Sequence, residues 1–340
     1  MKRIIQQLRS QCFNAKVLPN ETLDWIKENN LWNLWVPKEF GGLENTFSQG
    51  LKKLQSLAQI DGSLGWTVTL CSGANYFIGN LKKETAKAIF TSKGTCLGGS
   101  GGVFGIAEKI VHDYKVSGQW HYATGAPYLT HFTLNAKIIE NGKVLKNKDG
   151  NPTIRSFILP REKVKIIEDW NTMGLIATAT HSFDVPEVLV NEKYSFTYNK
   201  AFINQVIFKI PFVVFADLTL WVNYIGMGEH FLEEAEVFLN QKSLSLLAEL
   251  LQNSNYQIYS FAQEVESKIK NNSSVAEELV FNIHQTASKS VRELAAAIIS
   301  VYPFLGIKAS RKSHQLNQIF RDYFTATQHH NFVERKSESL

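Results

Sequence analysis

The sequence has few cysteines and no metal-binding pattern. Only three cysteines, Cys12, Cys71 and Cys96, occur in 340 residues, and none is spaced for a zinc or redox site. An odd number of widely separated thiols is typical of reduced proteins, so the expected location is the cytoplasm. The histidines never recur with carboxylates at helical metal-ligand spacing, so no metal ion is expected.

The sequence also lacks the segments that mark secreted, membrane and nucleic-acid-binding proteins. Residues 1–8 are basic and amphipathic, without the apolar core of a signal peptide. The most apolar window, residues 205–226, is interrupted by Lys209, Pro211 and Asp217, which favours a buried helix over a membrane span. The net charge of +5 is scattered along the chain, whereas nucleic-acid binders concentrate it on one face.

Residues 1–93 have the periodicity of helices. Asn20 is a candidate cap for a first helix that ends before residue 30. Apolar side chains recur on one stripe of residues 47–60, and Asp61-Gly62-Ser63 predicts a turn that ends this helix. A further apolar helix is predicted over residues 64–81.

Residues 94–198 have the pattern of a β domain. Asn141-Gly142 is a strong signal for a two-residue hairpin turn. Short β-branched runs are predicted to form strands over residues 113–117, 133–140, 153–159, 164–170 and 181–190. Their regular spacing predicts a small barrel or sandwich.

Residues 199–340 return to helical periodicity. Ser274 and Glu277 have the spacing of a capping box, and the apolar stripe behind them predicts a helix of about seven turns. This helix should end at Pro303, with another long helix before it and a last one over residues 310–331. The sequence therefore predicts an α+β protein with an N-terminal α-helical domain, a middle β domain and a C-terminal four-helix bundle.

The most informative segment is residues 118–125, Gly-Gln-Trp-His-Tyr-Ala-Thr-Gly. Its terminal glycines let the backbone bend and approach a ligand closely, because no Cβ is present. Trp120, Tyr122 and Thr124 lie between them and could stack on a flat ring and hydrogen-bond its rim. The alternative is a tight turn packed with aromatic side chains.

Several local patterns in one order resemble the acyl-CoA dehydrogenase superfamily over essentially the whole chain. These patterns are residues 34–42 (Leu-Trp-Val-Pro-Lys-Glu-Phe-Gly-Gly), the turn at residues 61–66, residues 118–125, residues 170–175 with Thr178, Thr180 and His181, and residues 321–330 (Arg-Asp-Tyr to His-His). The resemblance implies a flavin, FAD or FMN, held between the β domain and the bundle. It also implies a homotetramer.

Within this superfamily, residues 97–107 and 114–120 resemble the two-component flavin monooxygenases. Those enzymes take reduced flavin from a partner reductase and hydroxylate phenolic or related substrates. The resemblance implies that a hydroxyl such as that of Thr124 donates to a ring atom, while packed aromatics exclude water. It implies a cofactor site that contains Ser100, Trp120, Tyr122, Thr124, Gly125, Trp170 and Thr178.

The C-terminal signature departs from the dehydrogenase pattern. Many dehydrogenases have a glutamate nine residues after the arginine of Arg-Asp, and it removes the α-proton of an acyl thioester. That position is His330 here, beside His329. Histidine in this region is similar to the hydroxylases, where an imidazole could deprotonate a phenol. The alternative is a pair of surface histidines near a frayed terminus.

Asp217 is a second candidate base. Some dehydrogenases carry their carboxylate on an earlier helix, and Asp217 falls close to that place in an apolar run. A carboxyl group buried there would have a raised pKa and could accept a proton. The alternative is an acid that pairs with a neighbour or faces solvent.

Lys242 departs from the pattern that the resemblance implies for the cofactor site. The resemblance implies an arginine near this position that holds the flavin pyrophosphate of a neighbouring subunit. Lys242 keeps the charge but lacks the planar fork that grips two phosphate oxygens. Reduced flavin that visits transiently is therefore easier to reconcile with this chain than tightly resident FAD.

These observations predict a cytoplasmic flavin-dependent oxidoreductase that hydroxylates a small aromatic substrate with reduced flavin and O2. A flavin reductase or another electron-transfer protein is the expected partner. Two alternatives remain. One is an acyl-CoA dehydrogenase that uses FAD, and the other is a catalytically silent, flavin-poor relative with a binding role.

Overall fold

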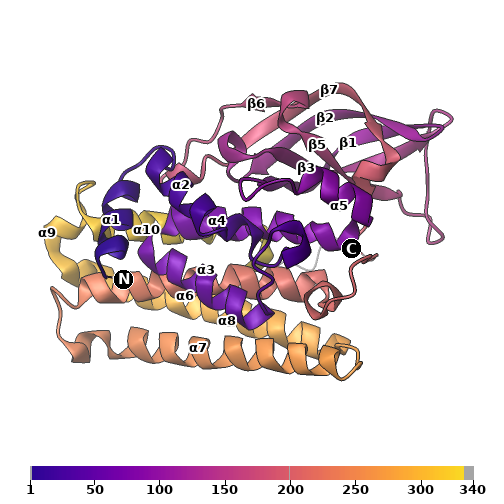
Figure 1. Ribbon diagram of the computed structural model, residues 1–340. Helices are drawn as coiled ribbons and strands as arrows, with labels where there is room; N and C mark the ends of the chain where they lie inside the picture. The colour runs from indigo at the N-terminus through magenta and orange to yellow at the C-terminus, as the bar shows by residue number, and fades with distance from the viewer. Residues whose placement is uncertain (1, 199, 333–340) are drawn as a thin grey trace.

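The computed structural model describes residues 2–198 and 200–332, in which helices, then strands, then helices follow one another along the chain (Figure 1). The first helices are α1 (Lys2–Cys12), α2 (Asn20–Glu28), α3 (Phe47–Ile60), α4 (Gly62–Asn75) and α5 (Lys83–Ile89). The last helices are α6 (Phe212–Ala235), α7 (Gln241–Lys270), α8 (Glu277–Val301), α9 (Gly306–Ala309) and α10 (Gln315–Ala326). The predicted order of helical and β regions is therefore observed, and the predicted boundaries after residues 93 and 198 fall between elements.

Asp61 joins α3 to α4 in a single residue. Its backbone ends α3, and its side chain accepts a hydrogen bond from the backbone N–H of Leu64 at 2.9 Å, which caps α4. The predicted turn over residues 61–63 is thus shorter than expected. Asn20 does not cap α2 as predicted, because it is the first helical residue and Pro19 precedes it without a side-chain cap. Proline fits there because its fixed φ suits the entry to a helix.

The middle region is one strongly curved sheet. Its strands are β1 (Leu97–Ile110), β2 (Asp113–Ala123), β3 (His131–Glu140), β4 (Lys143–Val144), β5 (Ile154–Pro160), β6 (Lys165–Ile167), β7 (His181–Asn191) and β8 (Ser195–Phe196). Neighbouring strands follow the order β6-β7-β2-β1-β3-β5-β8, and β4 pairs with β3. The pair β1–β3 is parallel, and the other pairs are antiparallel. The described strands thus form one sheet whose end strands, β6 and β8, are not paired with each other. The sequence predicted a small barrel or sandwich, and the structure has a single curved sheet that resembles an unclosed barrel.

Aromatic side chains fill the concave side of this sheet. The ring centroids of Phe132 on β3 and Phe183 on β7 are 4.8 Å apart, although two strands lie between theirs in the sheet. Flat neighbouring strands are spaced by about 4.8 Å each, so three steps would separate these rings by roughly 14 Å. The contact is possible only because the sheet curls around its own side chains.

The last helices form a bundle around α6. This helix packs on α3, α7, α8 and α10, and nearly all of its middle residues are buried, as the apolar window predicted. The predicted capping box of α8 is wrong: the helix begins at Glu277 after Ala276, and no side chain caps it. By length and composition the stretch Glu277–Ala309 could cross a membrane, yet it is interrupted at residues 302–305 and its stripe packs in the bundle.

Helix α4 lies between the bundle and the sheet (Figure 1). It packs on α3 and α6 on one side and on the start of β1 on the other. Asn75 fastens it to the sheet, since its side chain accepts from the backbone N–H of Leu97 at 2.7 Å and donates to the carbonyl oxygen of Thr95 at 2.9 Å. Helix α4 therefore faces both the bundle and the sheet, the two regions in which the candidate site residues lie.

Candidate functional site

Tyr122 is an exposed aromatic residue in a strained backbone conformation. It lies near the end of β2 with φ +67°, and the pairing of β2 with β7 shifts between Trp120 and Ala123. This is a β-bulge, which redirects a side chain out of the regular alternation. The side chain of Tyr122 is 71% exposed, so the bulge places a flat ring at the surface. A left-handed conformation costs a non-glycine residue about 1–2 kcal/mol, and such strain clusters at ligand sites.

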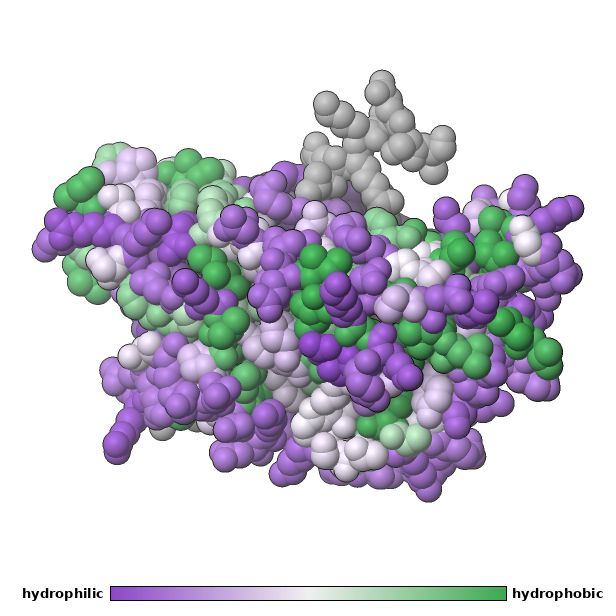
Figure 2. Space-filling view, turned by 90° about the horizontal axis from the view of Figure 1, so that it is seen from above, coloured by the Kyte–Doolittle hydropathy of each residue, from purple (hydrophilic) through white to green (hydrophobic). Residues whose placement is uncertain are grey.

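Trp170 lies next to Tyr122 and is fixed by two hydrogen bonds. The two rings meet edge to face with their centroids 6.5 Å apart. The indole N–H of Trp170 donates to the carbonyl oxygen of Leu175 at 2.9 Å, and its backbone N–H donates to His181 Nδ1 at 3.1 Å. Met173, three residues later in the sequence, is an exposed apolar side chain. In the view from above, apolar patches interrupt the polar surface of the molecule (Figure 2).

Thr124 and Thr178 belong to one row of hydroxyl groups. Thr124 Oγ1 lies 3.1 Å from Thr180 Oγ1, which lies 2.7 Å from Thr178 Oγ1. Thr178 Oγ1 donates to the carbonyl oxygen of Leu175 at 2.7 Å. All three threonines are buried, so these hydroxyls satisfy one another. The structure thus unites two residues predicted from separate motifs.

Gly125 allows the end of β2 to approach α4. Its φ is +75°, and a Cβ on it would lie 3.0 Å from Cys71 Sγ and 3.4 Å from Thr67 Cγ2. The backbone N–H of Gly125 donates to the carbonyl oxygen of Thr178 at 2.8 Å. Thr67 Oγ1 is buried beside this junction and has no hydrogen-bond partner in the described part of the chain. A larger residue at position 125 would separate the sheet from α4.

Ser100 lies on β1 close to this junction. Its hydroxyl accepts a hydrogen bond from the backbone N–H of Gly102 at 3.3 Å, and the residue is buried. A Cβ on Gly98, two residues earlier in the strand, would lie 3.2 Å from the carbonyl oxygen of Thr124. The start of β1 at Gly98 therefore lies close to Thr124, whereas the hydrogen bond of Ser100 is made within its own strand.

Trp120 does not belong to this surface. It is fully buried, its indole N–H donates to the carbonyl oxygen of Asn135 at 2.9 Å, and its ring stacks on Phe183 with centroids 5.6 Å apart. The side chain of Trp120 points to the concave face of the sheet, whereas the bulge directs Tyr122 outward to the solvent. Trp120 thus fills the core of the sheet, and its contact with a cofactor stays a prediction.

His329 and His330 lie after the end of α10, with their ring centroids 4.6 Å apart. His329 is half-buried and meets Trp66 of α4 edge to face at 5.6 Å, and Trp66 in turn meets Tyr224 at 6.1 Å. Burial, and then the charge of His330, lower the pKa of His329 to about 4, so its imidazole is neutral at pH 7. His330 is exposed, and His329 is the one that packs against aromatic side chains.

Asp217 on α6 is buried and paired. Its Oδ1 accepts a hydrogen bond from Asn331 Nδ2 at 2.7 Å, and its Oδ2 lies 3.2 Å from His284 Nδ1. Burial raises the pKa of Asp217, while the contacts with Asn331 and His284 oppose that rise. The raised pKa agrees with the expectation for a base, but both oxygens already have partners. The alternative expectation, an acid paired with a neighbour, describes this environment.

Lys242 is exposed in the first turn of α7 and lines a surface groove. The groove has a volume of about 580 Å³ and is lined by Glu236, Leu239, Asn240, Gln241 and Lys242. A second groove of about 450 Å³ lies between α6 and α7. Tyr122, Thr124 and Trp170 line neither groove. Lys242 is therefore not brought to the Tyr122 surface by the contacts within one chain.

Sequence analysis missed the contacts that hold the segment of Trp170 against α10. The backbone N–H of Leu175 donates to Asp322 Oδ1 at 2.6 Å, and Arg321 donates to the carbonyl oxygen of Met173 at 2.5 Å. A Cβ on Gly174 would lie 2.1 Å from the carbonyl oxygen of Arg321, so only glycine allows this approach. Leu175 itself has φ +50°. The Arg-Asp pair therefore positions the Trp170 segment.

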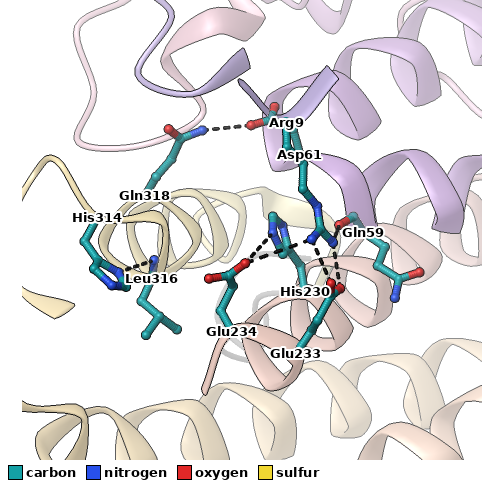
Figure 3. Close-up of polar contacts among 9 residues, drawn as sticks. All are labelled: Arg9, Gln59, Asp61, His230, Glu233, Glu234, His314, Leu316 and Gln318. Carbon is teal, nitrogen blue, oxygen red and sulfur yellow. Dashed lines mark hydrogen bonds and ion pairs between the residues drawn. The ribbon is translucent and has the colours of Figure 1, made fainter. Parts of the chain in front are cut away.

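A buried hydrogen bond fixes α10 in turn (Figure 3). Gln318 donates to Asp61 Oδ2 at 2.8 Å, and Asp61 caps α4, so α10 and α4 are tied together. In the same view Arg9 donates to both carboxylate oxygens of Glu233 on α6, at 2.8 and 2.7 Å. These contacts connect α1, α4, α6 and α10. The helices behind the candidate site are thus held by charged and amide groups as well as by apolar packing.

The chain is similar in sequence to proteins named as monooxygenases. The chain is 29% identical to an indole-3-acetate monooxygenase of Pseudomonas putida over 221 residues, which are 64% of this chain and 54% of that protein. It is 22% identical over 223 residues to the oxygenase subunit HsaA of a flavin-dependent monooxygenase of Mycobacterium tuberculosis, which covers 62% of this chain and 54% of that protein. The chain thus matches about half the length of these relatives. No protein-family model matches the chain.

The fold is shared with a solved structure over nearly the whole chain. XiaF from a Streptomyces species, determined in complex with FADH2 and glycerol, superposes with a TM-score of 0.87 at 17% sequence identity. The match covers 97% of this chain and 90% of that chain. The fold is therefore that of this flavin-binding structure, although the sequences have diverged far.

Proposed function

We propose that this chain is a flavin-dependent oxidoreductase that hydroxylates a small aromatic substrate with reduced flavin and O2. The observation that carries the proposal is the conformation of Tyr122: an exposed aromatic ring held at φ +67° in a strand bulge, edge to face with Trp170. Strain of this kind persists only where the surroundings fix it, and it is typical of ligand sites. The name of the Pseudomonas relative, an indole-3-acetate monooxygenase, supports an aromatic substrate, and the name of the Mycobacterium relative supports dependence on flavin.

The residues around Tyr122 fit a flavin ring. Tyr122 and Trp170 offer aromatic surface for the flat ring, and Thr124 offers a hydroxyl at its rim. Thr67 adds a buried hydroxyl without a partner beside Gly125, which is a group that a ligand could satisfy. When bound, reduced flavin would supply the electrons with which O2 is activated. FAD and FMN share this ring, and both remain candidates.

The neighbouring face of α4 suits an aromatic substrate. Trp66 points toward His329 and Tyr224, while the next residue, Thr67, contacts the junction at Gly125. Aromatic edges of this kind bind a flat ring and keep water away from it. Since the low pKa of His329 leaves its imidazole neutral, a ring nitrogen can accept a hydrogen bond from a phenol or from an indole N–H. His330 remains a second candidate for that role.

We also propose a reductase partner, a homotetramer and a cytoplasmic location. The name oxygenase subunit of the Mycobacterium relative supports a separate source of reduced flavin. Exposed apolar side chains on the bundle, such as Tyr256 and Phe281, support burial of that surface against other copies. Lys242 lies on an exposed groove and would contact the flavin phosphates of a neighbouring subunit.

The environment of Asp217 favours the hydroxylase over an acyl-CoA dehydrogenase. A base that removes an α-proton needs a free carboxylate oxygen near the substrate, whereas Asp217 pairs with Asn331 and His284. A silent, flavin-poor relative is distinguished by experiment. It would gain no thermal stability from flavin, because only a ligand that binds the folded state raises stability.

The test uses the purified chain with a flavin reductase, NADH and O2. We expect thermal stabilisation by FMN or FAD and O2-dependent hydroxylation of at least one compound in a panel of phenols and indoles, detected by mass spectrometry. A matched reaction with the His329→Phe variant controls for hydroxylation by released peroxide. Dye reduction by acyl-CoA, abolished by Asp217→Asn, would instead establish the dehydrogenase. Absence of any flavin binding would support the silent relative.

A further inference from the structure

A buried carboxyl group orients a half-exposed histidine in the bundle. The Nδ1 atom of His284 on α8 lies 3.2 and 3.3 Å from the two carboxyl oxygens of Asp217 on α6. Asn331 donates to Oδ1 of the same carboxyl group at 2.7 Å. Only 5% of the Asp217 side chain is exposed, whereas 41% of the His284 side chain is. The pair thus has one partner inside the protein and one at its surface.

These contacts decide which nitrogen of His284 can accept a proton. Burial raises the pKa of Asp217, but the contacts with Asn331 and His284 stabilise its ionised form. A carboxylate can only accept hydrogen bonds, so Nδ1 of His284 must carry the hydrogen. In the neutral imidazole the other nitrogen, Nε2, then has a lone pair. A histidine held in this way by a carboxylate can act as a general base at Nε2.

The pair adjoins the face of α4 proposed above for the substrate. The ring centroids of His284 and Phe332 are 6.2 Å apart, and those of Phe332 and Tyr224 are 5.7 Å apart. Tyr224 in turn meets Trp66, the residue of α4 that contacts His329. Aromatic rings therefore connect His284 to the substrate face without a break.

His329 holds a proton poorly. Burial and the charge of His330 lower the pKa of His329 to about 4, so about one molecule in a thousand is protonated there at pH 7. His329 can hold a phenol by a hydrogen bond, but the proton of that phenol needs another acceptor. His284 differs in two ways: a carboxyl group lies behind its ring, and its exposed side gives the proton a path to water.

We propose that His284, oriented by Asp217, takes the proton from the hydroxyl group of a phenolic substrate. This inference rests on the proposed function and narrows its substrate class to phenols. The O–H bond breaks, its electron pair stays on the substrate oxygen, and the proton bonds to Nε2 of His284. The charge of Asp217 balances the imidazolium, which then releases the proton to water. A phenolate ring is richer in electrons than a phenol and is hydroxylated more readily. Asp217, expected as a base, is here a positioning residue.

The first experiment needs no flavin. 4-Nitrophenol changes colour when it ionises, so visible absorbance reports the ionisation of the compound bound to the full chain. We expect the wild-type protein to ionise it about one pH unit below the pH at which the unbound compound ionises, a tenfold change in the equilibrium. His284→Gln should abolish this shift. Asp217→Asn should reduce it, because an amide can hold the imidazole with the wrong nitrogen protonated. His112→Gln, in the exposed turn between β1 and β2, is the matched control and should keep the shift.

The second experiment measures hydroxylation of phenols of graded acidity by the chain with a flavin reductase, NADH and O2. His284→Gln should lower kcat about 100-fold for phenols that are un-ionised at the assay pH, the usual effect of losing a general base. The same variant should hydroxylate phenols that are already ionised at nearly the wild-type rate, because they have no proton to lose. A merely structural effect would lower both rates equally.

Three results would overturn the inference and leave the proposed function standing. They are equal ionisation of bound 4-nitrophenol in the wild type and in His284→Gln, failure of the wild type to bind it, and equal loss of activity on both groups of phenols. Absence of hydroxylation of any aromatic compound by the wild type would instead overturn the proposed function. Circular dichroism checks that each variant folds, which we expect of His284→Gln because the side chain is half-exposed.

Discussion

The carboxyl group of Asp322 on α10 accepts a 2.6 Å hydrogen bond from the backbone N–H of Leu175, a residue 147 positions earlier in the chain. The carbonyl oxygen of Leu175 accepts in turn from the indole N–H of Trp170 and from Thr178 Oγ1. One residue therefore joins the bundle to both the aromatic and the hydroxyl part of the candidate flavin site. Substitutions on α10 should therefore alter the conformation of this site, although the substituted residues do not contact the ligand.

Replacing Asp322 by asparagine should flatten the dependence of stability on pH. Burial, and then the negative charge of Asp61, raise the pKa of Asp322 above that of an unfolded carboxyl, about 4. Above pH 4 the folded state therefore holds a proton that the unfolded state has lost, so the free energy of unfolding falls as pH rises toward neutrality. One such proton contributes up to about 1.4 kcal/mol per pH unit. Urea denaturation at pH 5 and pH 7 measures the slope, and an unaltered slope in Asp322→Asn would contradict this assignment.

Replacing Tyr122 by glycine should separate stability from ligand binding. Glycine adopts φ +67° without steric cost, and the exposed tyrosine ring contributes little burial, so the free energy of unfolding should rise by about 1 kcal/mol. Loss of the ring should weaken flavin binding at least tenfold, whereas Tyr122→Phe should retain it. Chemical denaturation and fluorescence titration measure the two effects. A glycine variant that is less stable, or that binds flavin as well as the wild type, would count against a functional origin of the strain.

His329 should destabilise the protein in acid. Burial and the charge of His330 lower the pKa of His329 to about 4, below the unfolded value of about 6.5. Between these values the unfolded state binds the proton more readily, so the free energy of unfolding falls as pH decreases from about 6.5 to 4. His329→Gln should remove up to about 1.4 kcal/mol per pH unit of this slope. Comparing the pH dependence of the free energy of unfolding of the variant with that of the wild type isolates the contribution of His329. The contribution of Asp322 has the opposite sign, because it lowers stability as pH rises.

Removing the charge of Lys242 should weaken flavin binding without altering the fold. The side chain is exposed on its groove, so Lys242→Gln should leave thermal stability unchanged while lowering the affinity several-fold and reducing its dependence on salt. Lys148→Gln, in the exposed loop after β4, is the matched control. Equal affinities for both variants would exclude a phosphate contact at position 242.

Local patterns in the sequence predicted the elements, because helix and strand periodicity are recorded residue by residue. The helix over Phe47–Ile60 has the predicted bounds, and the hairpin at Asn141-Gly142 forms between β3 and β4 as predicted. Caps were less predictable. Ser274 has the right spacing from Glu277, yet the chain enters α8 at Ala276, since a cap depends on how the preceding loop approaches the helix.

The assembly of the site was only partly predictable. Resemblance selected Tyr122 and Trp170, whose rings meet in the structure, and Thr124, whose hydroxyl meets that of Thr180. It also selected Trp120, because sequence alone cannot tell which face of a curled sheet a strand residue occupies once a bulge shifts the alternation. The bond between Leu175 and Asp322 left no local signal, since it depends on how two distant segments pack.

The most direct test of the account is a crystal structure of the protein with reduced flavin introduced under anaerobic conditions. We predict the flavin ring against Tyr122 and Trp170, with the hydroxyl of Thr124 at its rim. A ring found elsewhere, such as in the groove beside Glu236, would contradict the account. So would a Tyr122 surface without ring density under conditions in which flavin is bound in solution.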